Sequence, residues 1–367
     1  MRALQLSTPG FYQIDDHEIT NDITNRQTTR ADTLQAGLGA WRTYFASTNP
    51  TEEAALFGFA PQEGEEGTYF SFAAGDSCFF VLDTRTEQVD VFTPPVGWSD
   101  DGDGDGVSIL PGKLGVVQLT RLQHALLAAA SGDQCAFKVL MSPVPVTPNY
   151  SYGREGWGGH GDLNHLLSFI KAHDIQGVVW FSADAHVLGL YELAAGVVEI
   201  SASPYSAGSP PFNTIGGERG QILWEQDTFA SASRGKQFAV VDVDTTRHLS
   251  QGRPADDDDM AWLTSGPVMR VRLYTGVDEF AAPEVEITIS SRGGRWAITG
   301  GTKREQASAM DHTQTSAAGG DAPLVPKERA GSALRGFAFY LSMLTCVVAL
   351  ASVACFCCCP CAGCQKV

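Results

Sequence analysis

The fold is decided by the stretch GVVWFSADAH, residues 177–186, in which an apolar strand runs into a polar loop. Its first half, Gly177 to Phe181, is typical of a buried strand in an α/β sheet. Ligands in such sheets bind beyond the carboxyl ends of the strands, where Asp184 and His186 follow. In an extended segment these two side chains share one face, so both can reach one metal ion. A histidine with a purely structural role is the alternative.

A second polar cluster lies near the N-terminus, where Asp15, Asp16, His17 and Glu18 are followed by Asn21. Hard metal ions prefer carboxylate oxygens, and imidazole can bind a metal or donate a proton. The structural alternative is a helix N-cap, in which the Asp16 carboxylate accepts hydrogen bonds from the backbone that follows it. A metal site therefore requires the fold to bring two distant segments together.

Hydrophobic periodicity predicts strands and helices in alternation, followed by further strands. A helix is expected over 30–47, and a hairpin over 69–82 turns at Gly75-Asp76. This order predicts an α/β domain of stacked mixed β-sheets flanked by helices over residues 1–300. Further helices are expected over 114–130 and 162–172, and strands over 137–141, 178–181, 197–202, 238–243, 268–274, 285–289 and 296–298.

The order of these polar clusters and expected elements along the chain resembles that of the PhoD-type alkaline phosphatases and phosphodiesterases, within the calcineurin-like metallophosphoesterase superfamily. The family's Trp-Asp-Asp-His-Glu block is similar to residues 14–18, and its late Asp-Val-His block is similar to 184–186. The resemblance spans roughly residues 5–290 and implies a metallophosphoesterase-like fold. It is also carried by Asp83-Thr84-Arg85, by the helix from Gln118 to Leu127, by the strand and loop over 138–145, and by Glu199-Ile200-Ser201 through Gly208.

The resemblance implies a hydrolase that cleaves phosphomonoesters or phosphodiesters with two metal ions, which are iron and calcium in PhoD-type enzymes. It implies Asp16, Asp184 and His186 as metal ligands. It also implies that His17 contacts the phosphate or protonates the leaving oxygen, with Asn21 as a further site residue.

The resemblance leaves the role of Arg85 open. Its guanidinium is a candidate for binding the substrate phosphate. The sequence favours the structural alternative, in which Arg85 pairs with the neighbouring acid Asp83 or Glu87.

The chain departs from the family pattern at its start, where only 14 residues precede Asp15. Family members carry earlier blocks, including a Gly-Asp-x-x-Tyr stretch whose acids bind metal. We therefore expect an N-terminally truncated domain with uncertain activity. The alternative is a catalytically impaired relative that acts as a membrane-bound binding module.

The C-terminal part is expected to anchor the chain in a membrane. Residues 301–335 resemble a flexible linker, and 336–357 hold an apolar run of about 20 residues, enough to span a bilayer core. A cysteine-rich tail follows over 358–367, for which S-acylation is favoured over a metal-storage or redox role. The charge signals on membrane orientation conflict, with a slight preference for a lumenal or extracellular domain. The net charge of -17 argues against nucleic-acid binding.

Two of the nine cysteines, Cys78 and Cys135, lie in the expected globular domain. A disulfide between them is consistent with a lumenal domain. Two buried free thiols are the equally acceptable alternative.

Overall fold

A computed structural model describes the chain over residues 10–20, 31–65, 67–86, 112–132, 134–147, 156–157, 161–184, 188–202, 221–225, 237–244, 266–275 and 283–300. The chain divides into one unit over Met1–Thr315 and a second over Ser316–Val367. The expected linker, membrane helix and tail, like Asn21 and His186, lie outside the described residues. Within the ranges given, no helix is both long and apolar enough to cross a bilayer.

The larger of two sheets has seven strands in the order β1-β2-β3-β4-β6-β5-β7. Strands β2, β3, β4 and β6 run parallel, and β1, β5 and β7 pair antiparallel with their neighbours. The connections β2-α3-β3 and β3-α4-β4 are the strand–helix–strand units that the alternating pattern predicted. The strands are β1 (Phe70–Ala74), β2 (Ser77–Val81), β3 (Phe137–Ser142), β4 (Val178–Ser182), β5 (Leu188–Glu192), β6 (Val198–Ala202) and β7 (Gln221–Glu225).

The smaller sheet has four antiparallel strands in the order β11-β10-β9-β8. Along β10, the buried Val285, Ile287 and Ile289 alternate with the half-exposed Glu286 and Thr288. This period of two buries one face and leaves the other to solvent. The strands are β8 (Gln237–Asp244), β9 (Val268–Thr275), β10 (Val285–Ser290) and β11 (Trp296–Gly300).

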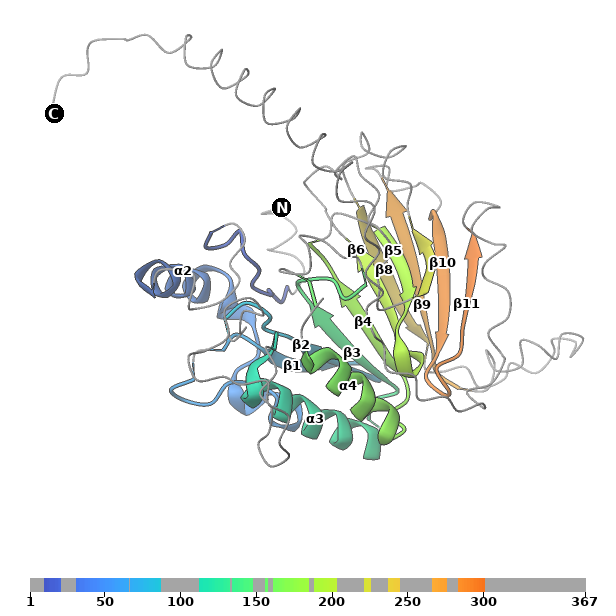
Figure 1. Ribbon diagram of the computed structural model, residues 1–367, viewed down its shortest axis with the longest axis horizontal. Helices are drawn as coiled ribbons and strands as arrows, with labels where there is room; N and C mark the ends of the chain where they lie inside the picture. The colour runs from blue at the N-terminus through green and yellow to red at the C-terminus, as the bar shows by residue number, and fades with distance from the viewer. Residues whose placement is uncertain are drawn as a thin grey trace, which may run out of the picture. The chain divides into compact units, whose positions relative to one another are not determined.

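The parallel strands are covered on both faces, as Figure 1 shows. Helices α3 (Gly115–Ser131) and α4 (Gly161–Ala172) pack on one face, and the smaller sheet packs on the other. Alternate residues of β3 enter the two cores, with Leu140 toward the helices and Val139 toward the smaller sheet. A strand buried on both faces needs a continuous apolar run, which is why these strands lack polar alternation.

A third, smaller core attaches the N-terminal segment. Helix α2 (Ala31–Tyr44) places Leu34, Leu38 and Trp41 against Ile14. Gly37 of α2 lies so close to Ile19 that an added Cβ would be 2.6 Å from that side chain. The segment that carries Asp15 and Asp16 is therefore held by α2. Short 3-10 helices follow at η1 (Ala46–Thr48), η2 (Glu52–Ala54) and η3 (Leu56–Gly58), with η5 (Ala194–Gly196) later in the chain.

The predicted elements that lie within the described residues are present, and their ends are shifted by at most three residues. Strands β5 and β7 were not predicted. Each is short, and β5 contains Gly189, which weakens a strand pattern. Cys78 and Cys135 form a disulfide, so the free-thiol alternative does not hold here.

Candidate active site

The candidate site lies at the carboxyl end of the parallel strands. Gln13 fixes the N-terminal segment there, because its Nε2 donates hydrogen bonds to the carbonyl oxygens of Leu82 (2.9 Å) and Met141 (2.7 Å). Leu82 directly follows β2, and Met141 is the next-to-last residue of β3. Asn49 holds the same segment from the other side, since it both accepts from the Tyr12 N–H and donates to the Tyr12 carbonyl.

Asp15 and Asp16 begin a tight turn rather than a helix. The backbone N–H groups of Ile19 and Thr20 both donate to the Asp16 carbonyl at 2.9 Å. The Asp16 carboxylate accepts from the His17 N–H at 2.8 Å, and Asp16 is 2% exposed. The turn therefore directs the Asp16 carboxylate inward.

Asp184 reaches the same place from β4, which ends two residues earlier at Ser182. Its backbone has φ of 61°, in the left-handed region that non-glycine residues seldom adopt. Aspartate tolerates this conformation better than most residues, and such strain concentrates at functional sites. One carboxylate oxygen from each of Asp15, Asp16 and Asp184 lies within 4.8 Å of the other two.

Arg85 lies among these three acids and is 1% exposed. Its Nε and Nη2 are 2.7 Å and 2.6 Å from Asp15 Oδ1. Its Nη2 is also 3.5 Å from Asp184 Oδ2 and 3.9 Å from Asp16 Oδ1. Among these four side chains, three negative charges meet one positive charge.

Arg85 lies in the loop after β2, and hydrogen bonds to Asp83 fix the conformation of this loop. The buried Asp83 carboxylate accepts hydrogen bonds from the backbone N–H groups of Thr68, Arg85 and Thr86 at 2.8–3.0 Å. Gln118 of α3 holds the Asp83 backbone, accepting from its N–H at 2.9 Å and donating to its carbonyl at 2.8 Å. The expected contact between Arg85 and Asp83 is thus a backbone one, and the guanidinium reaches Asp15 instead.

Glu199 supports the site from β6. It is fully buried, and its carboxylate accepts from the N–H groups of Val146 (2.7 Å) and Thr147 (2.8 Å) and from the Ser182 hydroxyl (2.7 Å). It thereby joins the loop after β3 to the last residue of β4. Burial raises the pKa of Glu199, and these hydrogen bonds oppose that rise.

The charges of the acid cluster perturb one another. Burial raises the pKa of Asp15, and the attraction of Arg85 offsets only part of that rise. Burial alone would lower the pKa of Arg85, but Asp15, Asp184 and Asp16 together raise it. Three carboxylates grouped at a largely buried position suit a hard cation, which prefers oxygen ligands.

The sequence-predicted site residues separate into three groups. Asp16, Asp184 and Arg85 come together at the cluster. His17 is in the same turn with an exposed side chain, which makes no hydrogen bond or ion pair within the described part of the chain. Asn21 and His186 lie outside the described residues.

Two functional candidates, Asp15 and Glu199, are not among the site residues expected from the sequence. Asp15 belongs to the acidic block at residues 15–18, but only its neighbour Asp16 was expected to be a metal ligand. Glu199 is an acid inside an otherwise apolar strand, and that is the signal that identifies it.

Comparison with known proteins identifies a family for this chain. A sequence model of the PhoD-like phosphatase family matches residues 1–251. A solved structure of PhoD is similar over 78% of this chain, at 14% identity and a TM-score of 0.43. The match covers 54% of the PhoD chain, so this chain spans about half the length of that relative. No curated protein matches. The family model covers well over half of the sequence, and the chain therefore belongs to the PhoD-like phosphatase family.

Proposed function

We propose that the chain is a metal-dependent phosphoesterase that hydrolyses phosphomonoesters or phosphodiesters. The observation that carries the proposal is the group of Asp15, Asp16 and Asp184, in which one carboxylate oxygen from each residue lies within 4.8 Å of the other two, beside Arg85. Buried like charges are costly unless a cation compensates them. With Arg85 counted, these side chains still carry a formal excess of two negative charges, which suits a divalent cation.

The roles proposed for the described residues follow from their positions, and those for His186 and Asn21 follow from the family resemblance. A bound metal ion would polarise the phosphoryl group and lower the pKa of a bound water. Asp15, Asp16 and Asp184 would hold a cation, His186 is proposed as a further metal ligand, and Asn21 is proposed as a further catalytic residue. Iron and calcium are the proposed pair of metal ions. Arg85 would turn a guanidinium N–H toward a phosphate oxygen, and the exposed His17 would protonate the leaving oxygen.

The test compares two aspartates that both have a positive φ. Asp184→Asn removes a proposed ligand charge, whereas Asp174→Asn changes an aspartate at φ of 48°, before β4 and therefore at the other end of that strand. Hydrolysis of p-nitrophenyl phosphate and its diester is expected to fall at least about 100-fold in Asp184→Asn, as for loss of a metal ligand or its support. Elemental analysis should show less bound metal. Wild-type activity in Asp184→Asn would refute the proposal, and Asp174→Asn should keep both activity and metal.

A catalytically impaired binding module is the second candidate. It is favoured by Arg85, whose guanidinium lies within 3.9 Å of all three acids and competes with a metal for them. Metal-free purified protein that binds phosphate esters without cleaving them would support this alternative.

The membrane anchor is proposed from the apolar segment 336–357. The Cys78–Cys135 disulfide supports a lumenal or extracellular catalytic domain, since disulfides persist in oxidising compartments. A chain ending at Arg335 is expected to fractionate as soluble protein and to retain phosphatase activity, whereas the full chain stays with membranes. A truncated chain that still sediments with membranes would contradict the anchor.

A further inference from the structure

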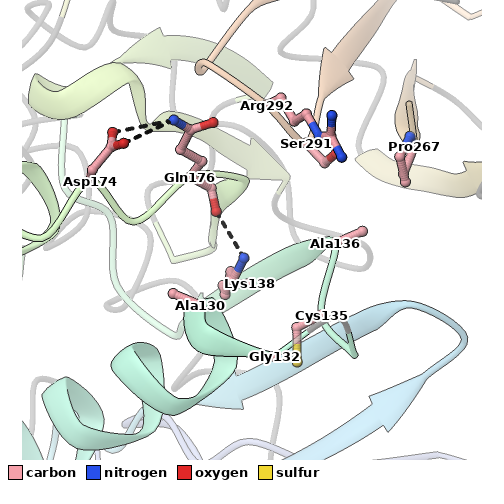
Figure 2. A pocket seen from close by; sticks show the side chains of 10 residues that line it. All are labelled: Ala130, Gly132, Cys135, Ala136, Lys138, Asp174, Gln176, Pro267, Ser291 and Arg292. Carbon is pink, nitrogen blue, oxygen red and sulfur yellow. Dashed lines mark hydrogen bonds between the residues drawn. The ribbon is translucent and has the colours of Figure 1, made fainter. Parts of the chain in front are cut away.

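A cavity of about 340 Å³ opens at the amino end of the parallel strands. The cavity lies at the start of β3 and before the start of β4, whereas Asp184 follows the end of β4. It is therefore at the opposite end of these strands from the acid cluster. Figure 2 shows its wall, in which the end of α3, the turn before β4 and the hairpin of the smaller sheet meet. Its polar lining includes Lys138, Asp174, Gln176, Ser291 and Arg292.

Lys138 is the unusual member of this lining. It is 7% exposed, and its Nζ donates one hydrogen bond, to the Gln176 carbonyl at 3.1 Å. An ammonium group has three N–H donors, so two more are available to the cavity. In the described part of the chain Lys138 makes no ion pair. Burial lowers its pKa, which is the behaviour of a cation that lacks a compensating charge.

The opposite wall adds a second cation. The exposed side chain of Arg292 and the neighbouring Ser291 line the cavity from the smaller sheet. The one carboxylate of the lining, Asp174, is 3.3 Å from Gln176 Nε2 through each of its oxygens. Gln176 in turn accepts from the Gly293 N–H at 2.7 Å, which ties the turn before β4 to the hairpin that carries Arg292. The lining thus carries two positive charges against one negative charge.

We propose that this cavity binds a phosphoryl-type oxyanion, held by Lys138 and Arg292, at a site separate from the acid cluster. An oxyanion would accept the two remaining N–H groups of Lys138 and one or two from the Arg292 guanidinium, which pairs well with phosphate geometry. The source is either free inorganic phosphate or a phosphoryl group on a small molecule. The proposal goes beyond the proposed hydrolysis and does not depend on it.

Site-specific acetylation tests the proposal without using enzyme activity. The full chain is treated with a limiting acetyl N-hydroxysuccinimide ester, and peptide mass spectrometry follows modification of Lys138 and of the exposed Lys171. Inorganic phosphate at about four times its Kd should slow modification of Lys138 about fivefold and leave Lys171 unchanged. Chloride at the same ionic strength should protect neither. Methylphosphonate, which has no ester bond to cleave, reports whether a phosphoryl group with an organic substituent also fits.

Two variants complete the test. Arg292→Gln should weaken the protection of Lys138 by phosphate, and Arg295→Gln, an exposed arginine of the same hairpin, should not. Equal modification of Lys138 with and without phosphate would overturn the proposal, because phosphate would then not bind beside its ammonium. Absence of modification in both conditions would also overturn it, because the cavity would then be closed to small solutes.

Discussion

At the scale of single residues, buried charges hold the site in shape, and Glu199 is the clearest case. Its two oxygens accept three hydrogen bonds, from two donors in the loop after β3 and one at the end of β4. In Glu199→Gln, an amide NH2 would replace one acceptor and face an N–H or O–H donor. We expect a loss of about 1–3 kcal/mol in the free energy of unfolding, with lower phosphatase activity because the ends of β3 and β4 separate. Urea unfolding and p-nitrophenyl phosphate hydrolysis measure the two effects.

The matched control is Glu192→Gln at the half-exposed end of β5. A substitution of this kind away from buried networks changes stability by about 0.5 kcal/mol or less. If both variants unfold at the same urea concentration, the hydrogen bonds of Glu199 do not hold the loop after β3 to the end of β4.

Lys138 predicts a dependence of stability on pH. Burial lowers its pKa in the folded chain from 10.5, so between the lowered value and 10.5 the unfolded chain binds more protons. Stability must then rise with pH through that window. The wild-type free energy of unfolding, measured relative to Lys138→Met, should increase from pH 7 to pH 10. The same comparison with Lys171→Met should be flat, and a flat result for Lys138 would show that its ammonium is fully compensated.

The sequence predicts single site residues better than their partners. Asp16 and Asp184 were expected because each follows a recognisable apolar or acidic pattern. The ion pair between Arg85 and Asp15 joins residues 70 positions apart. It depends on where the N-terminal segment crosses the end of β2, which the hydrogen bonds of Gln13 and Asn49 determine. No local sequence pattern predicts these long-range contacts.

At the scale of elements, helix α2 provides a sharp test of how the acidic turn is held. An added Cβ at Gly37 would be 2.6 Å from Ile19, whereas at Gly39 it would meet nothing within 4 Å. Gly37→Ala should therefore push Ile19 and the turn at Asp16 away from the cluster, lowering metal affinity and activity. Gly39→Ala, in the same helix, should stabilise the chain by about 0.5–1 kcal/mol. Thermal unfolding and metal titration of the two variants measure these effects.

A Gly37→Ala variant with wild-type metal affinity would contradict this account of α2. The Gly39→Ala variant makes that outcome interpretable, since it separates helix propensity from the contact with Ile19.

Local periodicity predicted the helices and most strands because each buries a face with a regular repeat. Local periodicity does not predict the order of the strands in the sheet. β6 pairs with β4 and β5 lies beyond it, so the order along the sheet does not follow the chain. That choice depends on how the apolar side chains of Ile200 and Leu190 pack in the core shared with the smaller sheet, and these contacts are not local in sequence.

At the scale of the whole molecule, the disulfide between Cys78 and Cys135 closes a loop with a sequence separation of 57. It joins the start of β2 to the segment before β3, at the opposite end of the strands from the acid cluster. Restricting a loop of this length in the unfolded chain is worth about 4 kcal/mol. Reduction, or the double variant Cys78→Ala with Cys135→Ala, should lower the free energy of unfolding by up to this amount.

Because the acid cluster is at the other end, the reduced protein should keep its activity at temperatures where it is still folded. Unfolding curves with and without reductant, each paired with an activity measurement, test both statements. An unchanged unfolding midpoint after reduction would show that the two cysteines are not bonded in solution.

The position of β6 between β4 and β5 also has a consequence for biosynthesis. As the nascent chain leaves the ribosome, β4 emerges first and its free edge has no neighbour until residues 198–202 follow. The next strand to emerge, β5, cannot occupy that place, because it pairs with β6 and β7. Until β6 has emerged and paired with it, β4 therefore offers an unpaired edge of the kind that chaperones protect.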